Sequence, residues 1–164
     1  MIGLHKLPAH LSLWSPAALI ATWFHSGLVK PASGTWGTLA ALPFGVSTAY
    51  YFGWQGLLVI ALLGYGLGHW ASTVWIAEAE DKDPSAIVID EAVGIWLALM
   101  LAPLTPLGIG LAFALFRLFD IVKPWPVSWA DQKLGGATGI MLDDVLAGIW
   151  AALILGALAV YGII

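Results

Sequence analysis

Five long apolar segments constrain the fold of this chain more than any other feature. They are separated by short turns or by small groups of charged residues, and they are Thr38–Phe52, Gly56–Ala77, Ala86–Ala102, Leu107–Val122 and Ile140–Ile164. Charged residues make up only 10% of the 164 residues, whereas a soluble domain carries about 25%. Because so few charges cannot cover a water-facing surface, the sequence predicts an all-α membrane protein, a single embedded domain over residues 1–164 with about five transmembrane helices.

A further helix is expected before the first apolar segment. Ser15-Pro16 is typical of an N-cap followed by proline at the first helical position. A helix over Pro16–Ser26 would be about 16 Å long at ~1.5 Å per residue, too short for a hydrocarbon core of roughly 30 Å. We therefore expect an interfacial or re-entrant helix. No cleavable signal peptide is expected, because no small-residue cleavage site follows an apolar run.

The charges predict how the chain sits in the membrane. With five crossings, residues 1–37, 78–90 and 120–144 lie on one side, and all the charged residues fall on or near it. The positive-inside rule makes that side cytoplasmic, with the N-terminus inside and the C-terminus outside.

Two classes of function are excluded by composition. Six basic residues against ten acidic ones leave no positive patch for nucleic acid. The absence of cysteine excludes disulfides, thiolate metal sites and cysteine nucleophiles.

A small-residue loop precedes the first apolar segment and is a candidate phosphate site. A helix that starts near Thr35 or Thr38 would direct its positive end and free N–H groups at a bound anion. The alternative is an ordinary cap before a helix. The candidate substrate-binding residues of this loop are Lys30, Ser33, Gly34, Thr35 and Thr38.

Acidic and basic residues also occur at the ends of apolar segments. Asp90-Glu91 and Asp143-Asp144 are adjacent acid pairs, and each acid inside a membrane costs about 2.5–3.5 kcal/mol on insertion scales. The alternative is that the helix dipole favours these acids at N-termini. Arg117, Asp120 and Lys123 follow at i, i+3 and i+6, on one helical face, as a functional group or as an ion-pair ladder that neutralises itself.

Together these residues predict a metal-dependent site. Five carboxylates near one boundary of the apolar segments would repel one another and resist ionisation. A hard cation such as Mg²⁺ resolves this, because it binds carboxylate oxygens and phosphate. The pattern predicts an enzyme that acts on an anionic lipid phosphate, although the spacing alone also fits a cation or proton-coupled transporter. The candidate metal ligands are Asp90, Glu91, Asp143 and Asp144.

Four motifs, in order, resemble those of phosphatidylglycerophosphatase A, a family of small bacterial inner-membrane lipid phosphatases. They are Gly34-Thr35-x-Gly37-Thr38-Leu39-Ala40-Ala41-x-Pro43 after Ser26-Gly27, Ile87-Val88-x-Asp90-Glu91-x-x-Gly94, Phe116-Arg117-x-x-Asp120-x-x-Lys123-Pro124-Trp125-Pro126, and Gly139-Ile140-Met141-x-Asp143-Asp144-x-x-Ala147-Gly148. The chain differs from the usual family pattern in having Ser33 in place of proline and Ala137 in place of glycine. The resemblance implies Mg²⁺-dependent removal of the terminal phosphate of phosphatidylglycerophosphate, with the active site facing the cytoplasm.

The residues suggest two mechanisms. In the first, the metal polarises the phosphate and activates water, Arg117, Lys123 and Lys30 stabilise the transferred group, and a spare carboxylate is the general base. In the second, Asp143 or Asp144 is a nucleophile that forms an aspartyl phosphate. Asp120 is expected to hold Arg117 and Lys123 in place. The sequence leaves the oligomeric state open.

Overall fold

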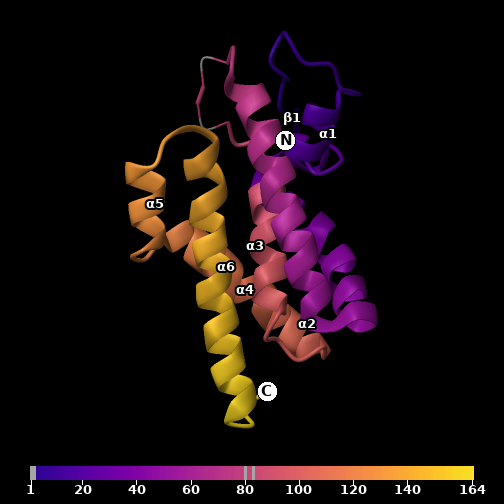
Figure 1. Cartoon of the computed structure of the whole chain (residues 1–164), viewed down its shortest axis with the longest axis vertical. Helices are drawn as coiled ribbons and strands as arrows, with labels where there is room; N and C mark the ends of the chain where they lie inside the picture. Colours follow the sequence, from indigo (N-terminus) through magenta and orange to yellow (C-terminus); the bar gives the residue numbers. More distant parts are fainter. Residues whose placement is uncertain (1–2, 80, 83) are drawn as a thin grey trace.

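The computed structural model describes residues 3–79, 81–82 and 84–164. Two residues of the predicted polar loop, Glu80 and Asp83, lie outside the described residues. The structure is helical apart from one short antiparallel pair of strands, so the predicted all-α class is confirmed (Figure 1). In chain order the elements are β1 (Gly3–Leu4), α1 (Pro16–Ala21), η1 (Ser26–Leu28), β2 (Val29–Lys30), α2 (Ser33–Ile76), α3 (Ile89–Leu99), α4 (Pro106–Val122), α5 (Val127–Lys133) and α6 (Gly136–Val160).

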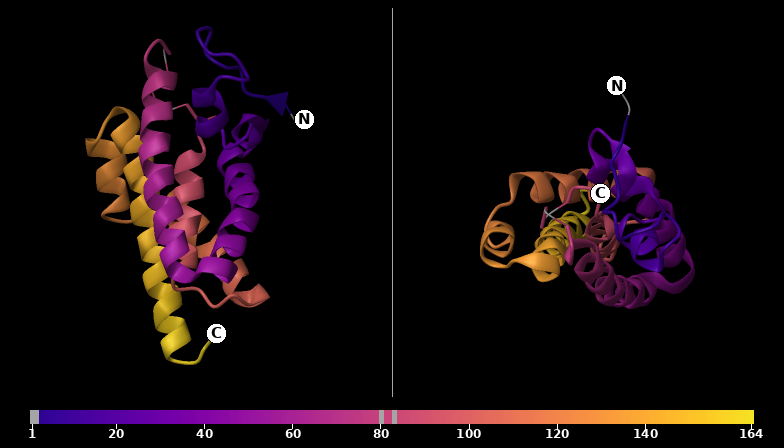
Figure 2. Two further views of the ribbon diagram at one scale, coloured as in Figure 1. Left: turned by 45° about the vertical axis from the view of Figure 1, so that its right-hand side comes forward. Right: turned by 90° about the horizontal axis from the view of Figure 1, so that it is seen from above.

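Helix α2 consists of two antiparallel arms. The chain leaves helical geometry at Gly53, where φ is 63° and ψ is −162°, a conformation that glycine adopts without the steric penalty of a side chain. Figure 2 shows the two arms side by side, joined at the end opposite the N-terminus. The reversal lies between the first two predicted apolar segments.

Two helices, α2 and α6, are long and apolar enough to cross a membrane. Helices α3 and α4 contain 11 and 17 residues, fewer than the ~20 that a spanning helix needs. The outer faces of the bundle expose large apolar side chains, among them Tyr50, Leu62 and Leu153. Such surfaces are expected where lipid rather than water surrounds the protein. The structure thus supports membrane association, and the five crossings remain a prediction.

Helix α3 is the centre of the bundle and packs against α2, α4 and α6. Nine of its eleven residues are buried. Trp96 Nε1 donates a hydrogen bond of 3.1 Å to the Ala41 carbonyl of α2. On the other side α3 crosses α6 so closely that a Cβ on Gly148 would lie 2.4 Å from the Gly94 carbonyl oxygen. Small residues permit this close approach, and α3 therefore has a fixed position relative to α6.

The N-terminal helix is shorter than predicted. Helix α1 begins at the expected Ser15 cap, whose Oγ accepts from Ala18 N at 3.3 Å, but it ends at Ala21 rather than Ser26. Three consecutive residues, Trp23, Phe24 and His25, have positive φ, which an α-helix cannot accommodate. Helix α1 packs against α2, with Ala17, Ala18 and Ala21 buried. A second difference is α5, because no helix was predicted between the fourth and fifth apolar segments.

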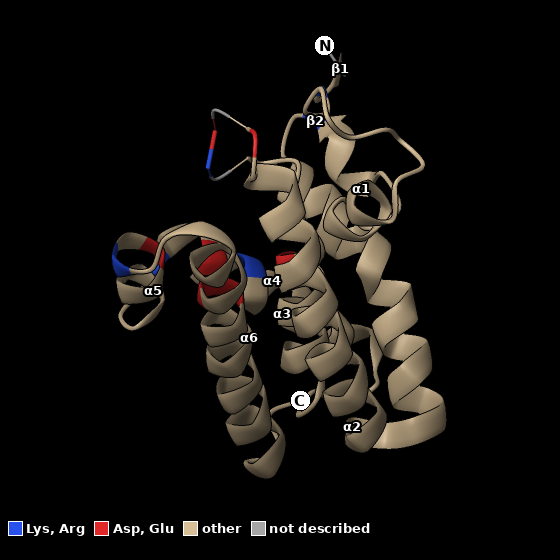
Figure 3. Cartoon of the chain, turned by 45° about the horizontal axis from the view of Figure 1, so that its top comes forward, with Lys and Arg blue, Asp and Glu red and all other residues tan. Residues whose placement is uncertain are grey.

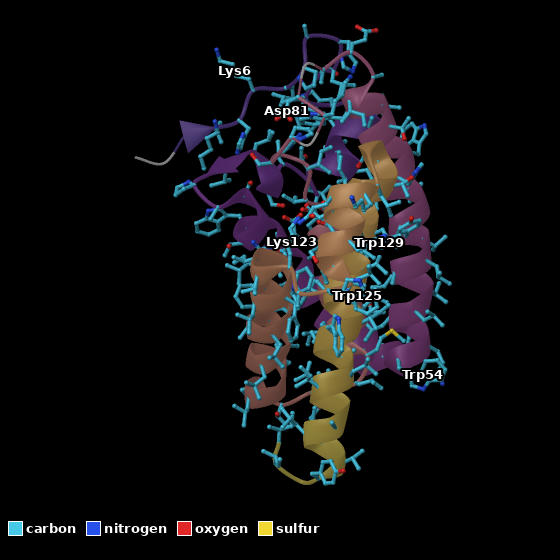
Figure 4. The ribbon with its side chains drawn as sticks, turned by 90° about the vertical axis from the view of Figure 1, so that its left-hand side faces the viewer. Lys6, Trp54, Asp81, Lys123, Trp125 and Trp129 are labelled. Carbon is cyan, nitrogen blue, oxygen red and sulfur yellow. The ribbon has the colours of Figure 1, made fainter. Side chains whose placement is uncertain are left out.

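The charged residues gather at one end of the bundle. Figure 3 shows them on the loop before α3, on α5 and on the facing turns of α4 and α6, while the distant turns of α2 and α6 carry none. Lys6 and Asp81 lie at this end, and Trp54 lies at the opposite end (Figure 4). This distribution places any site for a charged ligand near one boundary of the apolar bundle.

Candidate active site

Three helix ends bring the predicted charged residues together. Asp90 and Glu91 lie in the first turn of α3. Arg117 and Asp120 lie near the end of α4, and Lys123 caps it. Asp143 and Asp144 lie in the early turns of α6, where both are buried.

Six of these residues line one small cavity of about 170 Å³ between α3, α4 and α6. Its wall combines carboxylates and one lysine with a few apolar and small side chains. The lining residues are Pro84, Ser85, Ile87, Asp90, Glu91, Asp120, Lys123, Ile140, Asp143 and Asp144.

Three carboxylates form the most compact group in the cavity. Each of Asp90, Glu91 and Asp144 offers one oxygen, and these three oxygens lie within 4.8 Å of one another. Among the described residues, Glu91 Oε2 and Asp144 Oδ1 have no hydrogen-bond partner although both atoms are buried. Unpaired buried carboxylate oxygens cost free energy, and oxygen atoms converging in this way fit a hard divalent cation. The residues present therefore fit the predicted Mg²⁺.

The fourth predicted ligand, Asp143, has different partners. Its Oδ2 accepts a hydrogen bond of 2.8 Å from Lys123 Nζ, and its Oδ1 accepts from Asp144 N at 3.0 Å. Asp143 still lines the cavity, but it faces a cation of the protein rather than the three-oxygen group.

Arg117 lies behind the carboxylates and not in the cavity wall that the described residues form. Its Nη1 is 2.5 Å from Asp120 Oδ2 and 3.7 Å from Glu91 Oε1. The contacts are electrostatic rather than well-aligned hydrogen bonds, because Nη1 has no described hydrogen-bond partner of good geometry. Asp120 thus holds Arg117, as predicted, and it also neighbours Asp144.

The predicted ladder is wrong at Lys123. Lys123 has a left-handed backbone (φ 49°) that ends α4, so its side chain does not continue the helical face of Arg117 and Asp120. Lys123 pairs instead with Asp131 of α5 and with Asp143 of α6. Burial lowers the pKa of Lys123, but the hydrogen bonds to Asp131 and Asp143 outweigh burial and hold this pKa above its ordinary value. Lys123 is therefore a permanent cation at the cavity wall.

The start of α2 approaches the Arg117–Glu91 pair. A Cβ on Gly34 would lie 2.2 Å from Glu91 Oε1 and 2.9 Å from Arg117 Nη1. Only glycine leaves these side chains in place, so the beginning of the predicted phosphate loop reaches the charged group.

The hydroxyl groups of this loop have other partners. Ser33 Oγ donates to the Ser85 carbonyl, and Thr38 Oγ1 donates to the Gly34 carbonyl at 2.7 Å. Thr35 is half-buried in the first turn of α2. Lys30 is exposed on β2, where it pairs with Gly3. The hydroxyl groups of Ser33 and Thr38 therefore bond within the protein, and the N–H groups of Thr35 and Trp36 donate to the Ala32 carbonyl.

Sequence reasoning missed two residues at the cavity. Ser85 lines it, and Asp131 holds Lys123. The amphipathic pattern of residues 127–133 could have indicated a short helix. No sequence signal showed that Lys123 turns toward this helix, because that turn depends on the left-handed backbone at the end of α4.

An apolar helical bundle that turns its few charges toward one boundary cavity is a membrane-associated protein with a site for a charged group. The sequence pattern of the phosphatidylglycerophosphatase A family matches residues 19–159, and the chain belongs to this family.

Curated relatives cover nearly the whole chain. A phosphatidylglycerophosphatase A of Haemophilus influenzae is 42% identical over 149 residues, which are 90% of this chain and 91% of the relative. A protein of the same name from Escherichia coli K12 is 35% identical over 148 residues, 90% of this chain and 86% of the relative. A putative phosphatidylinositol-3-phosphatase of Bacteroides thetaiotaomicron is 36% identical over 144 residues, 84% and 89% of the two chains. No solved structure matches the chain significantly.

The family makes the chain an enzyme, a phosphatase. The transporter that the spacing alone also allowed is not favoured, because the two relatives named phosphatidylglycerophosphatase A span about 90% of the chain.

Proposed function

We propose that the protein is a Mg²⁺-dependent lipid phosphatase that converts phosphatidylglycerophosphate to phosphatidylglycerol and inorganic phosphate in phospholipid biosynthesis. The observation that carries the proposal is the group of three converging carboxylates, Asp90, Glu91 and Asp144, with two unpaired buried oxygens. It lies in a cavity that also contains a lysine. The names of the relatives supply the substrate.

Asp90, Glu91 and Asp144 would hold the metal ion. When bound, Mg²⁺ supplies positive charge that polarises a phosphate and lowers the pKa of water. Asp143 was predicted as a fourth ligand, and we now assign it a separate role because Lys123 occupies its Oδ2.

Cations of the chain bind and orient the phosphate. Lys123 Nζ is at the cavity wall and meets the phosphate directly. Arg117 lies one layer behind, next to Gly34 and the beginning of α2, and its charge stabilises the negative charge that grows in the transition state. The N–H groups of the first turn of α2 add to this positive environment.

The proton transfers fall to Asp143. Lys123 and the Asp144 N–H keep Asp143 oriented at the cavity wall. As water attacks phosphorus, Asp143 accepts one water proton, the bond from phosphorus to the glycerol oxygen breaks, and the protonated Asp143 gives that proton to the glycerol oxygen. In the alternative mechanism, a carboxylate oxygen of Asp143 or Asp144 attacks phosphorus and water then hydrolyses the aspartyl phosphate.

We further propose that the charged end of the bundle faces the cytoplasm of a bacterial inner membrane. The two arms of α2 together with α3, α4 and α6 would make five crossings. The N-terminus and the C-terminus lie at opposite ends of the bundle (Figure 1), which supports an odd number of crossings. Reporter fusions at Ile164 test the orientation: a cytoplasmic signal there excludes five crossings.

The decisive experiment measures phosphate release from phosphatidylglycerophosphate in mixed micelles by the detergent-purified protein. Activity should vanish with EDTA and return with Mg²⁺, because the carboxylates need a cation to stay ionised side by side. Full turnover in excess chelator contradicts the metal site.

A second substrate sharpens the assignment. Phosphatidylinositol-3-phosphate should be tested in parallel, because one relative is named for that activity. We expect the glycerophosphate lipid to give the higher kcat/KM. A higher kcat/KM for phosphatidylinositol-3-phosphate would make the inositol lipid the substrate, while the proposed metal-dependent chemistry would stay unchanged.

A further inference from the structure

Lys123 joins three helices at the edge of the carboxylate cavity. It caps α4, and its Nζ donates to Asp131 of α5 and, at 2.8 Å, to Asp143 of α6. Three separate elements therefore meet at one ammonium group.

The two carboxylates occupy different surroundings. Asp143 lines the carboxylate cavity, and its side chain is 11% exposed. Asp131 is 32% exposed and lines a neighbouring cavity of about 220 Å³ that also contains Asp143. Among the described residues, the carboxylate cavity does not include Asp131 in its wall. Among the described residues, the contact that ties Asp131 to the carboxylate cavity is therefore its ion pair with Lys123.

We propose that Asp131 is a positioning residue for phosphate binding: it draws Lys123 Nζ from the outer side, so that the ammonium stays at the cavity wall beside Asp143. The proposal rests on the proposed function, since it gives Lys123 a phosphate to bind.

The first argument is conformational. A lysine side chain is flexible, and fixing it in one position costs side-chain entropy. If Lys123 had a single carboxylate partner, its Nζ could occupy several positions around that carboxylate. Two carboxylates on different helices restrict Nζ to the place where both can be reached, so the cation is ordered before substrate arrives.

The second argument counts donors. An ammonium group has three N–H donors. Within the described part of the chain two of them serve Asp131 and Asp143, which leaves one for a phosphate oxygen.

The test is a double-mutant cycle on phosphatidylglycerophosphate hydrolysis with Mg²⁺ present. Asp131→Asn should raise KM about tenfold, because a charge-assisted hydrogen bond is lost, with kcat within about twofold of wild type. Asp131→Glu keeps the charge and should recover KM to within about threefold of wild type. Glu78→Gln is the matched control, because it removes an exposed carboxylate outside the site and should change neither constant.

Coupling decides whether Asp131 acts through Lys123. In a Lys123→Gln background, Asp131→Asn should have no further effect on KM, since the residue that it positions is gone. Additive effects of the two substitutions would overturn the proposal, as would an unchanged KM in Asp131→Asn. A merely structural role would lower the thermal stability and leave the effects additive.

A binding measurement separates this proposal from the proposed function. Inorganic phosphate with Mg²⁺ should raise the Tm of the wild-type protein, and Asp131→Asn should need about tenfold more phosphate for the same rise. If wild-type protein releases no phosphate from the lipid, the proposed function fails. If phosphate stabilises Asp131→Asn and wild-type protein equally, the positioning role fails.

Discussion

The middle of the central helix α3 and its charged end use glycine contacts in opposite ways. In the apolar part, Gly148 of α6 faces the Gly94 backbone, and an added Cβ would lie 2.4 Å from a carbonyl oxygen. At the charged end, a Cβ on Gly34 would meet the tips of two flexible side chains, Glu91 and Arg117. Backbone atoms cannot move aside for an added Cβ, whereas the tips of flexible side chains can. A glycine at the crossing therefore serves stability, whereas the glycine at the charged end serves the arrangement of polar groups.

The largest effect should come from the charged end, on activity alone. Asp144→Asn removes one of the proposed metal ligands and should lower kcat/KM by about 10²-fold or more. Stability should hold or rise, because the substitution removes the charge of a buried carboxylate that has one oxygen without a hydrogen-bond partner. Phosphate release and thermal unfolding of the same preparation test this. An inactive variant whose Tm has also dropped sharply would show that Asp144 is needed for the fold. The contrast between the charged end of α3 and its crossing with α6 would then be wrong.

The second effect should come from the helix crossing, on stability. Gly148→Ala should destabilise the protein by about 3 kcal/mol, since overpacking against backbone forces α3 and α6 apart. Gly66→Ala is the matched control on α2, because an added Cβ there meets nothing within 4 Å. The control should be neutral or stabilise slightly, as alanine favours a helix more than glycine does. Equal Tm values for the two variants would mean that the contact between α3 and α6 can accommodate an added methyl group.

The third effect tests the glycine at the charged end. Gly34→Ala should lower kcat by about tenfold, because the new methyl group displaces Glu91 and Arg117 from the arrangement that stabilises the transition state. The loss of stability should stay under about 1 kcal/mol, since side-chain tips can move aside. Gly110→Ala on α4 is the control, with nothing within 4 Å of its added Cβ. A large fall in Tm for Gly34→Ala would place this glycine in the same category as Gly148.

The apolar elements could be predicted because their signal is local. Runs of apolar residues and the break at Gly53-Trp54-Gln55 depend only on neighbouring residues in the sequence. The gathering of carboxylates also followed from the sequence, since each acid lies near an end of an apolar segment and those ends meet on one side. The start of α1 at Ser15 was predictable, but its early end was not, because positive φ at Trp23, Phe24 and His25 has no sequence signature.

The finer arrangement of the site depends on where chains turn. Periodicity placed Lys123 on the same face as Asp120, but a left-handed residue at the end of α4 redirects it. The same turn brings α5 and Asp131 to Lys123. Adjacent acids also differ: Asp143 binds Lys123, whereas Asp144 keeps an oxygen unpaired. The sequence could not show this difference between two adjacent acids, because it comes from the helices that surround them.

The smallest predicted effect concerns pH and again lies at the charged end. His5 precedes β2 in the chain and lies near Lys30, and its Nε2 is 3.5 Å from Ser85 Oγ. His5 lines a separate cavity of about 370 Å³ together with Lys6, Glu78 and Asp81. Burial, and then the charge of Lys30, lower the pKa of His5 in the folded protein below its ordinary 6.5. The unfolded chain therefore binds a proton more readily, so the contribution of His5 to stability is present above about pH 6.5 and is lost as the pH falls below it.

Between pH 7.5 and 5.5 the Tm of wild-type protein should fall by up to about 2 °C more than that of His5→Gln. The difference between the two proteins is the quantity to measure, because other acids contribute equally to both curves. If His5→Gln lost as much stability as the wild type over this range, or more, His5 would not be the group that titrates.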